Sequence, residues 1–184
     1  QGNQITGVVQ DLFGNDLGSF SQRYLDNLIL TGTTDTSMTG NALNNGMVGN
    51  DGANSLTGGN GNDSLNGGAG ADMLYSGNGN DSVNGGSGND LIIGGDGQGD
   101  DLYDGGDGID TVKYSSAVAS GINVDLALGT ATGTEIGTDI LRNIENVIGG
   151  QKNDVINGSA VTNVLDGGLG ADEMSGAGGD DSYI

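Results

Sequence analysis

The stretch GGNGNDSLN at residues 58–66 is followed directly by GGAGADMLY at 67–75 and SGNGNDSVN at 76–84. Each of these nonapeptides starts with glycine-rich sequence, carries an aspartate at its sixth position and an aliphatic residue at its eighth. Glycine adopts positive φ and allows neighbouring backbones to approach closely, so the first six residues can form a tight turn. The last three residues are long enough for one short strand, whose middle side chain points away from its neighbours.

This nine-residue period predicts the fold class. Two turns and two strands close one coil, so we predict an all-β parallel β-roll, a β-solenoid with coils of 18 residues and one larger inserted coil. Each aliphatic residue contributes about 1.5–3 kcal/mol when buried, whereas ordering nine residues costs about 1–2 kcal/mol each. Apolar burial alone is therefore insufficient, and another interaction must hold the turns. The side chains expected to point inward are Leu65, Leu74, Val83, Ile92, Val112, Ile156, Leu165 and Met174.

The chain divides into four segments by its repeat pattern. Apolar residues at helical spacing within 5–13 are interrupted by Gly14 and Gly18, which predicts at most a short helix, and 25–33 favours a strand. The second block stops where a further repeat would begin, which indicates a truncated array. The segments are an N-terminal lead-in (1–39), a first repeat block (40–113), an inserted β segment (114–148) and a second repeat block (149–184).

The inserted segment has a different pattern. Ile122, Val124, Leu126 and Leu128 alternate with smaller or polar residues, which predicts a strand. The sequence 129–138 predicts a loop, and the stretch that follows leads back into the repeat with Val147 pointing inward. We interpret the segment as a larger coil in a continuing solenoid.

Composition excludes several classes of protein. The chain has 40 glycines and no proline, which excludes collagen, and its net charge of −21 would indicate disorder were it not for the regular period. Four Lys and Arg against 25 Asp and Glu argue against nucleic acid as a partner. The absence of a long apolar run argues against membrane insertion. The absence of His and Cys removes the usual general base and the usual zinc ligands, so we predict no enzyme.

Residues one coil apart should stack on the same side, which brings aspartates together in pairs. Two carboxylates at one strand spacing repel each other unless a cation lies between them. Turn carbonyls add further oxygens, and a flexible all-oxygen site suits Ca²⁺ better than Mg²⁺. The expected pairs are Asp63–Asp81, Asp72–Asp90, Asp90–Asp110, Asp154–Asp172, and Asp81 with either Asp100 or Asp101 of the stretched unit 94–104.

Other interpretations of the acidic residues are solvated surface groups and Asx-type turns. Evenly repeated identical pairs argue against one pair of glycosidase acids and for a lattice of ions. The acidic residues outside the repeat positions are expected to be surface groups: Asp11, Asp16, Asp26, Asp125, Glu135, Glu145 and Glu173.

The repeats resemble the RTX, or hemolysin-type calcium-binding, family, whose consensus is GGxGxDxUx. The resemblance covers about 49–113 and 149–184, and four consecutive units over 58–93 keep the nine-residue register. The lead-in TGNALNN (39–45) and the inserted segment are also similar to sequences that flank such repeats in large secreted bacterial proteins. The resemblance implies a parallel β-roll that binds several Ca²⁺ ions, roughly five to seven.

Family sites use the carbonyls of turn positions two and four and the aspartate of one turn. They add the carbonyls of positions one and three and the aspartate of the turn one coil later. The resemblance therefore implies three sites: Gly59, Gly61, Asp63, Ser76, Asn78 and Asp81; Gly68, Gly70, Asp72, Gly85, Ser87 and Asp90; Gly86, Gly88, Asp90, Gly105, Asp107 and Asp110.

Further ligands come from the stretched unit and from the second block. Asn54 and Asn163 lack charge, so we expect the Asn54–Asp72 and Asn163–Asp181 sites to be weak or empty. Lys152 in a ligand turn is a further departure from the family pattern. The additional candidate ligands are Asp100, Asp101, Gly150, Asp154, Gly167, Asp172 and Asp181.

The resemblance implies a calcium-binding module that folds on Ca²⁺ binding outside the cell, within a larger bacterial protein exported by type I secretion. The alternative is a structural repeat protein of an extracellular fibre, adhesin stalk or surface layer assembled with Ca²⁺. Both place the protein outside the cell or at its surface.

The predicted strands also differ in their outward faces. One sheet should expose Ser64, Asn66, Ser82 and Asn84, an ordinary wet surface. The other should carry large apolar groups side by side, which usually mark a contact. We expect this face to bind a second copy or an adjoining domain, or to be covered by the insert or the N-terminal segment. Its residues are Met73, Tyr75, Leu91 and Ile93, bordered by Ser55, Thr57, Thr111 and Lys113.

Overall fold

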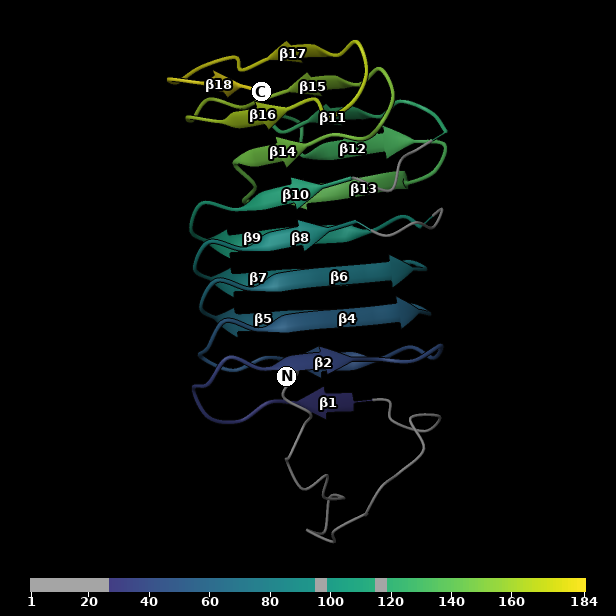
Figure 1. The fold of residues 1–184 in the computed structure, drawn as a ribbon, viewed down its shortest axis with the longest axis vertical. Helices are drawn as coiled ribbons and strands as arrows, with labels where there is room; N and C mark the ends of the chain where they lie inside the picture. The colour runs from purple at the N-terminus through teal and green to yellow at the C-terminus, as the bar shows by residue number, and fades with distance from the viewer. Residues whose placement is uncertain (1–26, 95–98, 115–118) are drawn as a thin grey trace, which may run out of the picture.

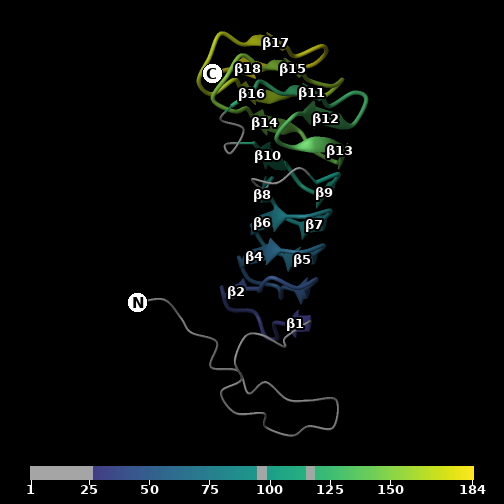
Figure 2. The same cartoon turned by 90° about the vertical axis from the view of Figure 1, so that its right-hand side faces the viewer.

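The computed structural model describes residues 27–94, 99–114 and 119–184. The described residues form an elongated all-β solenoid in which two mainly parallel sheets face each other (Figures 1 and 2). The β-roll that the nine-residue period predicts is therefore confirmed. The interpretations of residues 1–26, including the short helix and the surface roles of Asp11, Asp16 and Asp26, lie outside the described residues.

Successive strands alternate between the two sheets, because each six-residue turn reverses the chain across the narrow core. The first sheet contains, in spatial order, β1 (Asn27–Ile29), β3 (Gly46–Val48), β5 (Ser64–Ala69), β7 (Ser82–Ser87), β9 (Leu102–Asp107), β13 (Gly137–Arg142), β12 (Thr130–Gly133), β11 (Asn123–Asp125), β15 (Val155–Asn157) and β17 (Glu173–Ser175). The second contains β18 (Ser182–Tyr183), β16 (Val164–Asp166), β14 (Asn146–Ile148), β10 (Thr111–Lys113), β8 (Leu91–Ile93), β6 (Met73–Asn78), β4 (Ser55–Asn60) and β2 (Ser37–Thr39).

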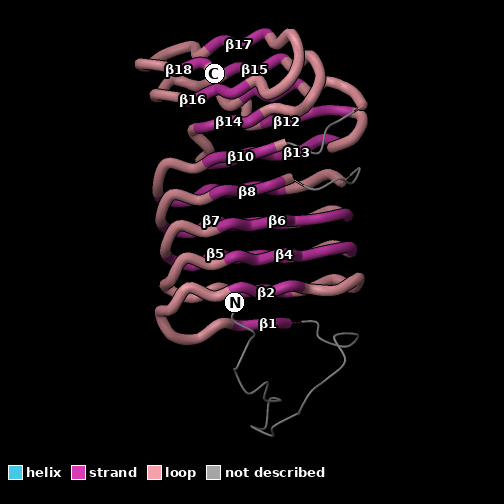
Figure 3. Tube along the Cα trace, viewed as in Figure 1, coloured by secondary structure: helices cyan, strands magenta, loops and turns pink. Residues whose placement is uncertain are grey.

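The strand register repeats once per coil. Leu65 lies opposite Val83 in one sheet and Leu56 lies opposite Leu74 in the other, each pair 18 residues apart. The turns therefore stack along the two lateral edges of the solenoid, where Figure 3 shows loops beside the strands, with β4 to β7 and β9 extending into the first half of their turns. This stacking brings equivalent turn residues of successive coils together.

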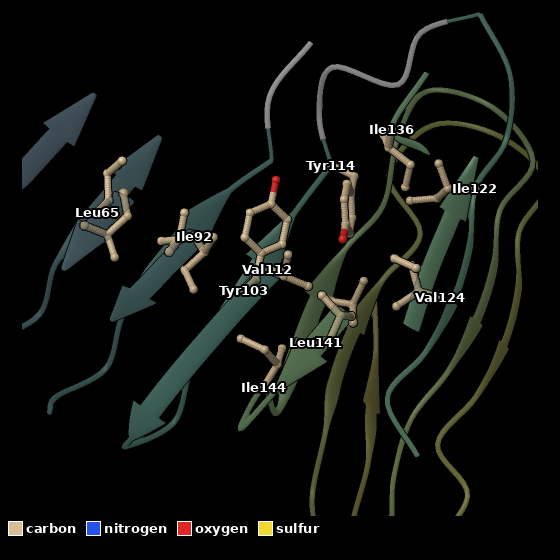
Figure 4. Close-up of a cluster of buried hydrophobic side chains, with 14 of the residues drawn as sticks. Leu65, Ile92, Tyr103, Val112, Tyr114, Ile122, Val124, Ile136, Leu141 and Ile144 are labelled. Atoms are coloured by element: carbon tan, nitrogen blue, oxygen red, sulfur yellow. The ribbon is translucent and has the colours of Figure 1, made fainter. Parts of the chain in front are cut away.

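The core is a column of one inward side chain per strand. Of the eight residues predicted to point inward, all are buried except Met174 near the C-terminal end, which is partly buried and packs against the core. The column also contains two tyrosines that the pattern did not place there, Tyr103 and Tyr114, whose rings lie with centroids 6.5 Å apart (Figure 4). Each brings a hydroxyl group into the apolar column, and a buried hydroxyl requires a hydrogen-bond partner.

The inserted segment joins the first sheet as an antiparallel unit. Strand β12 pairs antiparallel with both β11 and β13, while β13 pairs parallel with β9 and β11 pairs parallel with β15. The expected strand is confirmed for Asn123–Asp125 only, because residues 126–129 form a turn that leaves Leu128 76% exposed. The expected loop over 129–138 is correct for the turn at 134–136 but wrong for residues 130–133, which form β12. The sequence of β12 gives little sign of a strand, because its only buried side chain is the small Ala131.

In the second sheet the insert contributes only its last strand, β14. Strand β10 pairs directly with β14, so Val112 lies beside Val147, the residue predicted to return to the inward column. The other strands of the insert, β11 to β13, belong to the first sheet, on the side of β5, β7 and β9 in Figure 2. As a result, residues from the end of the insert lie directly above the last turn of the first repeat block.

The outward faces of the two sheets differ as the sequence predicts. Met73 pairs with Leu91, and Tyr75 with Ile93, so four large side chains lie side by side on the second sheet. Met73 is 46% exposed and the other three are half-buried. We refer to these four residues as the apolar outer face. The corresponding positions of the first sheet, Ser64, Asn66, Ser82 and Asn84, are exposed and polar.

Candidate metal centres

Each turn can be numbered from 1 to 6, with the aspartate or asparagine at position 6 and the three strand residues at positions 7 to 9. In the turn 58–63, for example, Gly58 occupies position 1 and Asp63 position 6. The turn one coil later, 76–81, stacks on it, and strand pairing extends into both turns, with Gly59 opposite Gly77. The candidate sites lie between such stacked turns.

The position-6 residues form two ladders of hydrogen bonds along the solenoid. The backbone N–H of Asp63 donates to Oδ1 of Asp81 at 2.8 Å, and that of Asp81 donates to Oδ1 of Asp101 at 2.7 Å. The first ladder contains Asn45, Asp63, Asp81, Asp101 and Asp139. The second ladder contains Asn54, Asp72, Asp90, Asp110 and Glu145.

All the predicted aspartate pairs are found in this arrangement, including Asp154 with Asp172, where the N–H of Asp154 donates to Oδ1 of Asp172 at 2.9 Å. The structure also decides between the two candidates of the stretched unit. Asp101 is buried in the ladder, whereas Asp100 is exposed at position 5. Asp100 belongs to an outer row in which its N–H donates to Asn80 Oδ1 and its own Oδ1 accepts from Thr138.

The second carboxylate oxygen of the ladder aspartates is the unusual feature. In five of them Oδ2 is buried and has no hydrogen-bond partner in the structure, namely Asp63, Asp72, Asp81, Asp90 and Asp110. A buried charged oxygen without a donor is strongly unfavourable. Each of these atoms therefore requires a proton or a cation.

Backbone carbonyl groups converge on the same spaces. A Cβ atom at Gly77 would collide with the carbonyl oxygen of Gly59, and one at Gly79 with that of Gly61, so both carbonyls face the later turn. A Cβ atom at Gly58 would meet the carbonyl oxygen of Ser76 and would lie 2.5 Å from Asp63 Oδ2. Carbonyls of two turns and the free carboxylate oxygen therefore face one another.

The same convergence recurs in the second ladder. The carbonyls of Gly68 and Gly70 face Gly86 and Gly88, and that of Gly85 faces Gly67. One coil later, the carbonyls of Gly86 and Gly88 face the next turn and that of Gly105 faces back toward Gly85. The position-3 carbonyls of Asn78, Ser87 and Asp107 also point back, because each accepts the position-4 N–H of the preceding turn. These are the carbonyls that the family pattern implies as ligands.

The groups that could bind a metal ion at each site are therefore two carboxylates and several backbone carbonyls. Among the described residues no group of three or more His, Cys, Asp or Glu could hold a metal ion. A cation at these sites must take most of its ligands from the backbone. Such a set of hard oxygen donors fits Ca²⁺, which accepts carbonyls and carboxylates in flexible geometry.

Four turns satisfy their position-6 side chain without a cation, and we call them self-capped turns. In each, the N–H of position 2 donates to the position-6 oxygen, as Asn50 does to Asn54 Oδ1 at 2.7 Å and Ser159 to Asn163 Oδ1 at 2.7 Å. The self-capped turns are 40–45, 49–54, 149–154 and 158–163. Two of them carry Asn54 and Asn163, the residues of the sites that the sequence predicts to be weak or empty.

The difference between turn types follows from the backbone at positions 2 and 4. The turns with an unpartnered aspartate have positive φ at both, for example 114° at Gly59 and 113° at Gly61. The self-capped turns do not, and three of them have a side chain at position 4: Leu43, Lys152 and Val161. Because residues with a Cβ disfavour positive φ, these turns take the conformation that directs the position-2 amide inward.

Asp154 shows the effect at a predicted ligand. Its Oδ1 accepts the N–H of Ile122 at 2.9 Å and its Oδ2 accepts the N–H of Gly150 at 2.6 Å. The carbonyls of Gly150 and Lys152 still face the later turn that contains Asp172. The charge of Asp154 is thus partly compensated by amides, unlike the five unpartnered aspartates.

A third solution occurs where the insert begins. Tyr103 donates its hydroxyl to Asp101 Oδ2 at 2.6 Å, and Tyr114 donates to Asp139 Oδ2 at 3.0 Å. The two tyrosines thereby satisfy the last two carboxylates of the first ladder. The repeat pattern does not predict these roles of Tyr103, Tyr114 and Asp139. The role of Tyr103 could have been predicted, because it occupies an inward position two residues after an aspartate. That of Asp139 could not, because it lies 38 residues from its ladder partner.

Glu145 corrects another expectation. It was predicted to be a surface group, but it is half-buried and its Oε2 accepts the N–H of Asp110 at 2.8 Å. Glu135 is also half-buried and accepts the N–H groups of Ala119 and Ser120. Neither role is visible in the sequence, because the partners lie 15 to 35 residues away.

Burial changes the acidity of the ladder carboxylates. Desolvation raises the pKa of Asp81 and Asp110 to about 6, with a further increase from the charges of neighbouring carboxylates. Desolvation likewise raises the pKa of Asp139 to about 7. The same cause raises the pKa values of Asp63, Asp72, Asp90, Asp101 and Asp154 above their ordinary value. Burial therefore favours the protonated form until a cation compensates the charge.

Comparison with known protein families agrees with this geometry. The model of the RTX calcium-binding nonapeptide repeat matches residues 39–74, 48–83, 67–98, 75–112 and 148–183, which together cover more than half of the chain. The chain belongs to this family. No curated protein matches the chain. In the described part of the chain, no helix is long and apolar enough to cross a membrane.

The raised pKa values predict how the metal-free RTX roll responds to pH. Because the folded-state pKa values exceed the unfolded ones, the folded state binds more protons between about pH 4 and pH 7, and its stability falls as pH rises through this range. We expect metal-free protein to show more folded β structure at about pH 5 than at about pH 7.5. Circular dichroism in EDTA at the two pH values measures this. Greater metal-free stability at the higher pH would contradict the assignment.

Proposed function

We propose that this RTX β-roll is a folding module that takes up Ca²⁺ between its stacked turns and becomes ordered only when the ion is bound. The observation that carries the proposal is the set of five buried Oδ2 atoms without a donor. In Asp63, Asp72 and Asp90 this atom faces a space where carbonyl groups of two successive turns converge. A divalent cation in that space would be attracted by both carboxylates and would replace the missing donor.

The sites supported best are those in which both turns have positive φ at positions 2 and 4. They lie between turns 58–63 and 76–81, between 67–72 and 85–90, and between 85–90 and 105–110. These are the three sites implied by the resemblance. The site between Asp81 and Asp101 should bind calcium more weakly, because the hydroxyl of Tyr103 already donates to Asp101. The sites above self-capped turns should also bind more weakly, because backbone amides donate to their position-6 side chains.

The thin core and the high negative charge together make folding depend on calcium. A net charge of −21 on 184 residues opposes compaction, and the unpartnered carboxylates are buried only in the folded state. A ligand that binds the folded state alone stabilises it by mass action. Removal of calcium therefore leaves a chain with too little apolar burial to compensate for repulsion and chain entropy.

This dependence suits a protein that crosses a membrane unfolded. The proposal includes export through type I secretion, as part of a larger bacterial protein, from a compartment poor in calcium to one rich in it. Affinities of about 10⁻⁴–10⁻³ M, typical of extracellular modules, would separate the two states. The role is structural: the carboxylates that the structure gathers are arranged as a repeated lattice, without the asymmetry of an acid and base pair.

The first test compares the chain with and without calcium. We expect a β-type circular dichroism spectrum in millimolar Ca²⁺ and a largely unfolded spectrum in excess EDTA, because the buried carboxylates then repel. Re-addition of calcium should restore the spectrum, whereas equal Mg²⁺ should not. An unchanged β spectrum in excess chelator would overturn calcium-dependent folding.

The second test separates the ion from the hydrogen-bond ladder. Asp90→Asn keeps an oxygen for the N–H of Asp72 but removes one charge from a residue placed between two sites. We expect this variant to bind about two fewer ions and to be more stable than wild type without calcium.

Asp181→Asn is the matched control for this test, because Asp181 lies in the last turn and Asn163 beneath it is already self-capped. Its calcium stoichiometry should change by no more than about one ion. Isothermal titration calorimetry counts the ions, and the amount of β structure that circular dichroism shows in EDTA compares the metal-free stabilities. Equal losses of calcium in the two variants would refute the proposed sites.

The apolar outer face supports a second proposal, docking of another copy of this chain or of an adjoining domain. In calcium, wild type should associate with itself as concentration rises in sedimentation velocity. Leu91→Ser with Ile93→Ser should stay monomeric, while Asn66→Ser with Asn84→Ser on the opposite face should behave as wild type. A wild-type monomer at every concentration excludes the second copy, and loss of the calcium-induced fold in the apolar variant indicates internal cover instead.

A further inference from the structure

We propose that Glu145 completes an additional divalent-cation site at the upper end of the second ladder, between turn 105–110 and the segment 143–145. The family pattern does not include this site, because its upper half comes from the insert and contains no nonapeptide. The proposal rests on the calcium function proposed above and adds a residue and a location to it.

Strand register places Glu145 directly at a ladder position. Thr111 pairs with Asn146 and Val112 with Val147, so Glu145 stands to Asp110 as each position-6 residue stands to the one below. The N–H of Asp110 donates to Glu145 Oε2 at 2.8 Å, and the N–H of Asp90 donates to Asp110 Oδ1 at the same distance. The N–H of Asn146 donates to the carbonyl of Asp110 at 2.9 Å, as Thr111 does to Asp90.

The turn that carries Glu145 is shorter than the others. Arg142 pairs with Asp104 in one sheet and Asn146 pairs with Thr111 in the other. Only residues 143–145 therefore connect β13 to β14, whereas six residues form the turn in a complete repeat. The longer side chain of glutamate keeps a carboxylate in the ladder despite this shortening.

Asn143 supplies the carbonyl that position 1 supplies elsewhere. Its φ of 49° lies in the left-handed region, which asparagine tolerates, and its side-chain amide donates to Asp104 Oδ1 at 2.7 Å. A Cβ atom at Gly105 would collide with the Asn143 carbonyl oxygen and would lie 2.5 Å from Asp110 Oδ2. This is the same relation that Gly58 has with Ser76 and Asp63.

The observation that points to a ligand is Asp110 itself. Its side chain is 0% exposed, and its Oδ2 has no hydrogen-bond partner in the structure. That oxygen faces the space bounded by Asn143 and Gly105, with Glu145 as the second carboxylate. The hard oxygen donors suit a Ca²⁺-type ion, and the carbonyls of Gly106 and Gly108 are the equivalents of those that face the later turn in the sites below.

The first ladder provides a contrast within the same molecule. There the insert also supplies the last carboxylate, Asp139, but Tyr103 and Tyr114 donate hydroxyls to the two acidic side chains. No such hydroxyl reaches Asp110 Oδ2. Tyrosine hydroxyls thus join the insert to the first repeat block along the first ladder, and a bound cation would join them along the second.

The test uses Glu145→Gln, which keeps an oxygen for the N–H of Asp110 while removing the charge. Titration calorimetry with CaCl₂ should show one ion fewer per chain than wild type, with the other ions bound as before. Glu135→Gln is the matched control, a glutamate of the same insert whose partners are the amides of Ala119 and Ser120. It should bind as many ions as wild type.

The outcomes distinguish this proposal from the general one. Wild type that binds no calcium would overturn the proposed function, whereas equal stoichiometry of wild type and Glu145→Gln would overturn this site alone. If circular dichroism shows that Glu145→Gln does not fold in calcium, Glu145→Asp replaces it. The shorter side chain keeps the charge and should lower the affinity for one ion, and wild-type affinity for every ion would contradict the site.

Discussion

A buried carboxylate oxygen with no donor is the constraint on which this β-roll depends. The aspartate at the end of each turn uses one oxygen to accept the backbone N–H of the aspartate below, which fixes the stacking of successive coils. The other oxygen is left inside the turn, where φ at two glycines turns the amides away and the carbonyls inward. The geometry that stacks the turns thereby creates the demand for a cation.

The position-6 side chains are compensated in three ways at different positions along the solenoid. Turns near the N-terminal end of the solenoid and at the start of the second block cap themselves with a backbone amide. Turns of the central first block leave the oxygen open for an ion. At the insert, two tyrosine hydroxyls take the place of the ion along one ladder. Since stability in a solenoid depends on neighbouring repeats, calcium bound at the central turns, as proposed above, would stabilise the whole stack.

The inserted segment is integrated through the same ladders as well as through its own buried apolar side chains, such as Val124, Leu141 and Ile144. Asp139 continues the first ladder and Glu145 continues the second, although they lie 38 and 35 residues from the aspartates they contact. The second sheet meanwhile continues without interruption from β10 to β14. The carboxylate ladder thus survives an interruption of the repeat, because the sheet register restores its spacing.

The nine-residue period by itself determined the parallel roll, the inward column from Leu65 to Leu165, the stacking of the aspartate pairs and the two polar and apolar outer faces. These features are local, since turn chemistry and strand alternation act within one or two repeats. Only the tertiary structure decided that Asp101 rather than Asp100 enters the ladder, that residues 130–133 form a strand, and that Glu145 is no surface group. Those outcomes depend on which distant strands pair, and the spacing of the residues does not show that pairing.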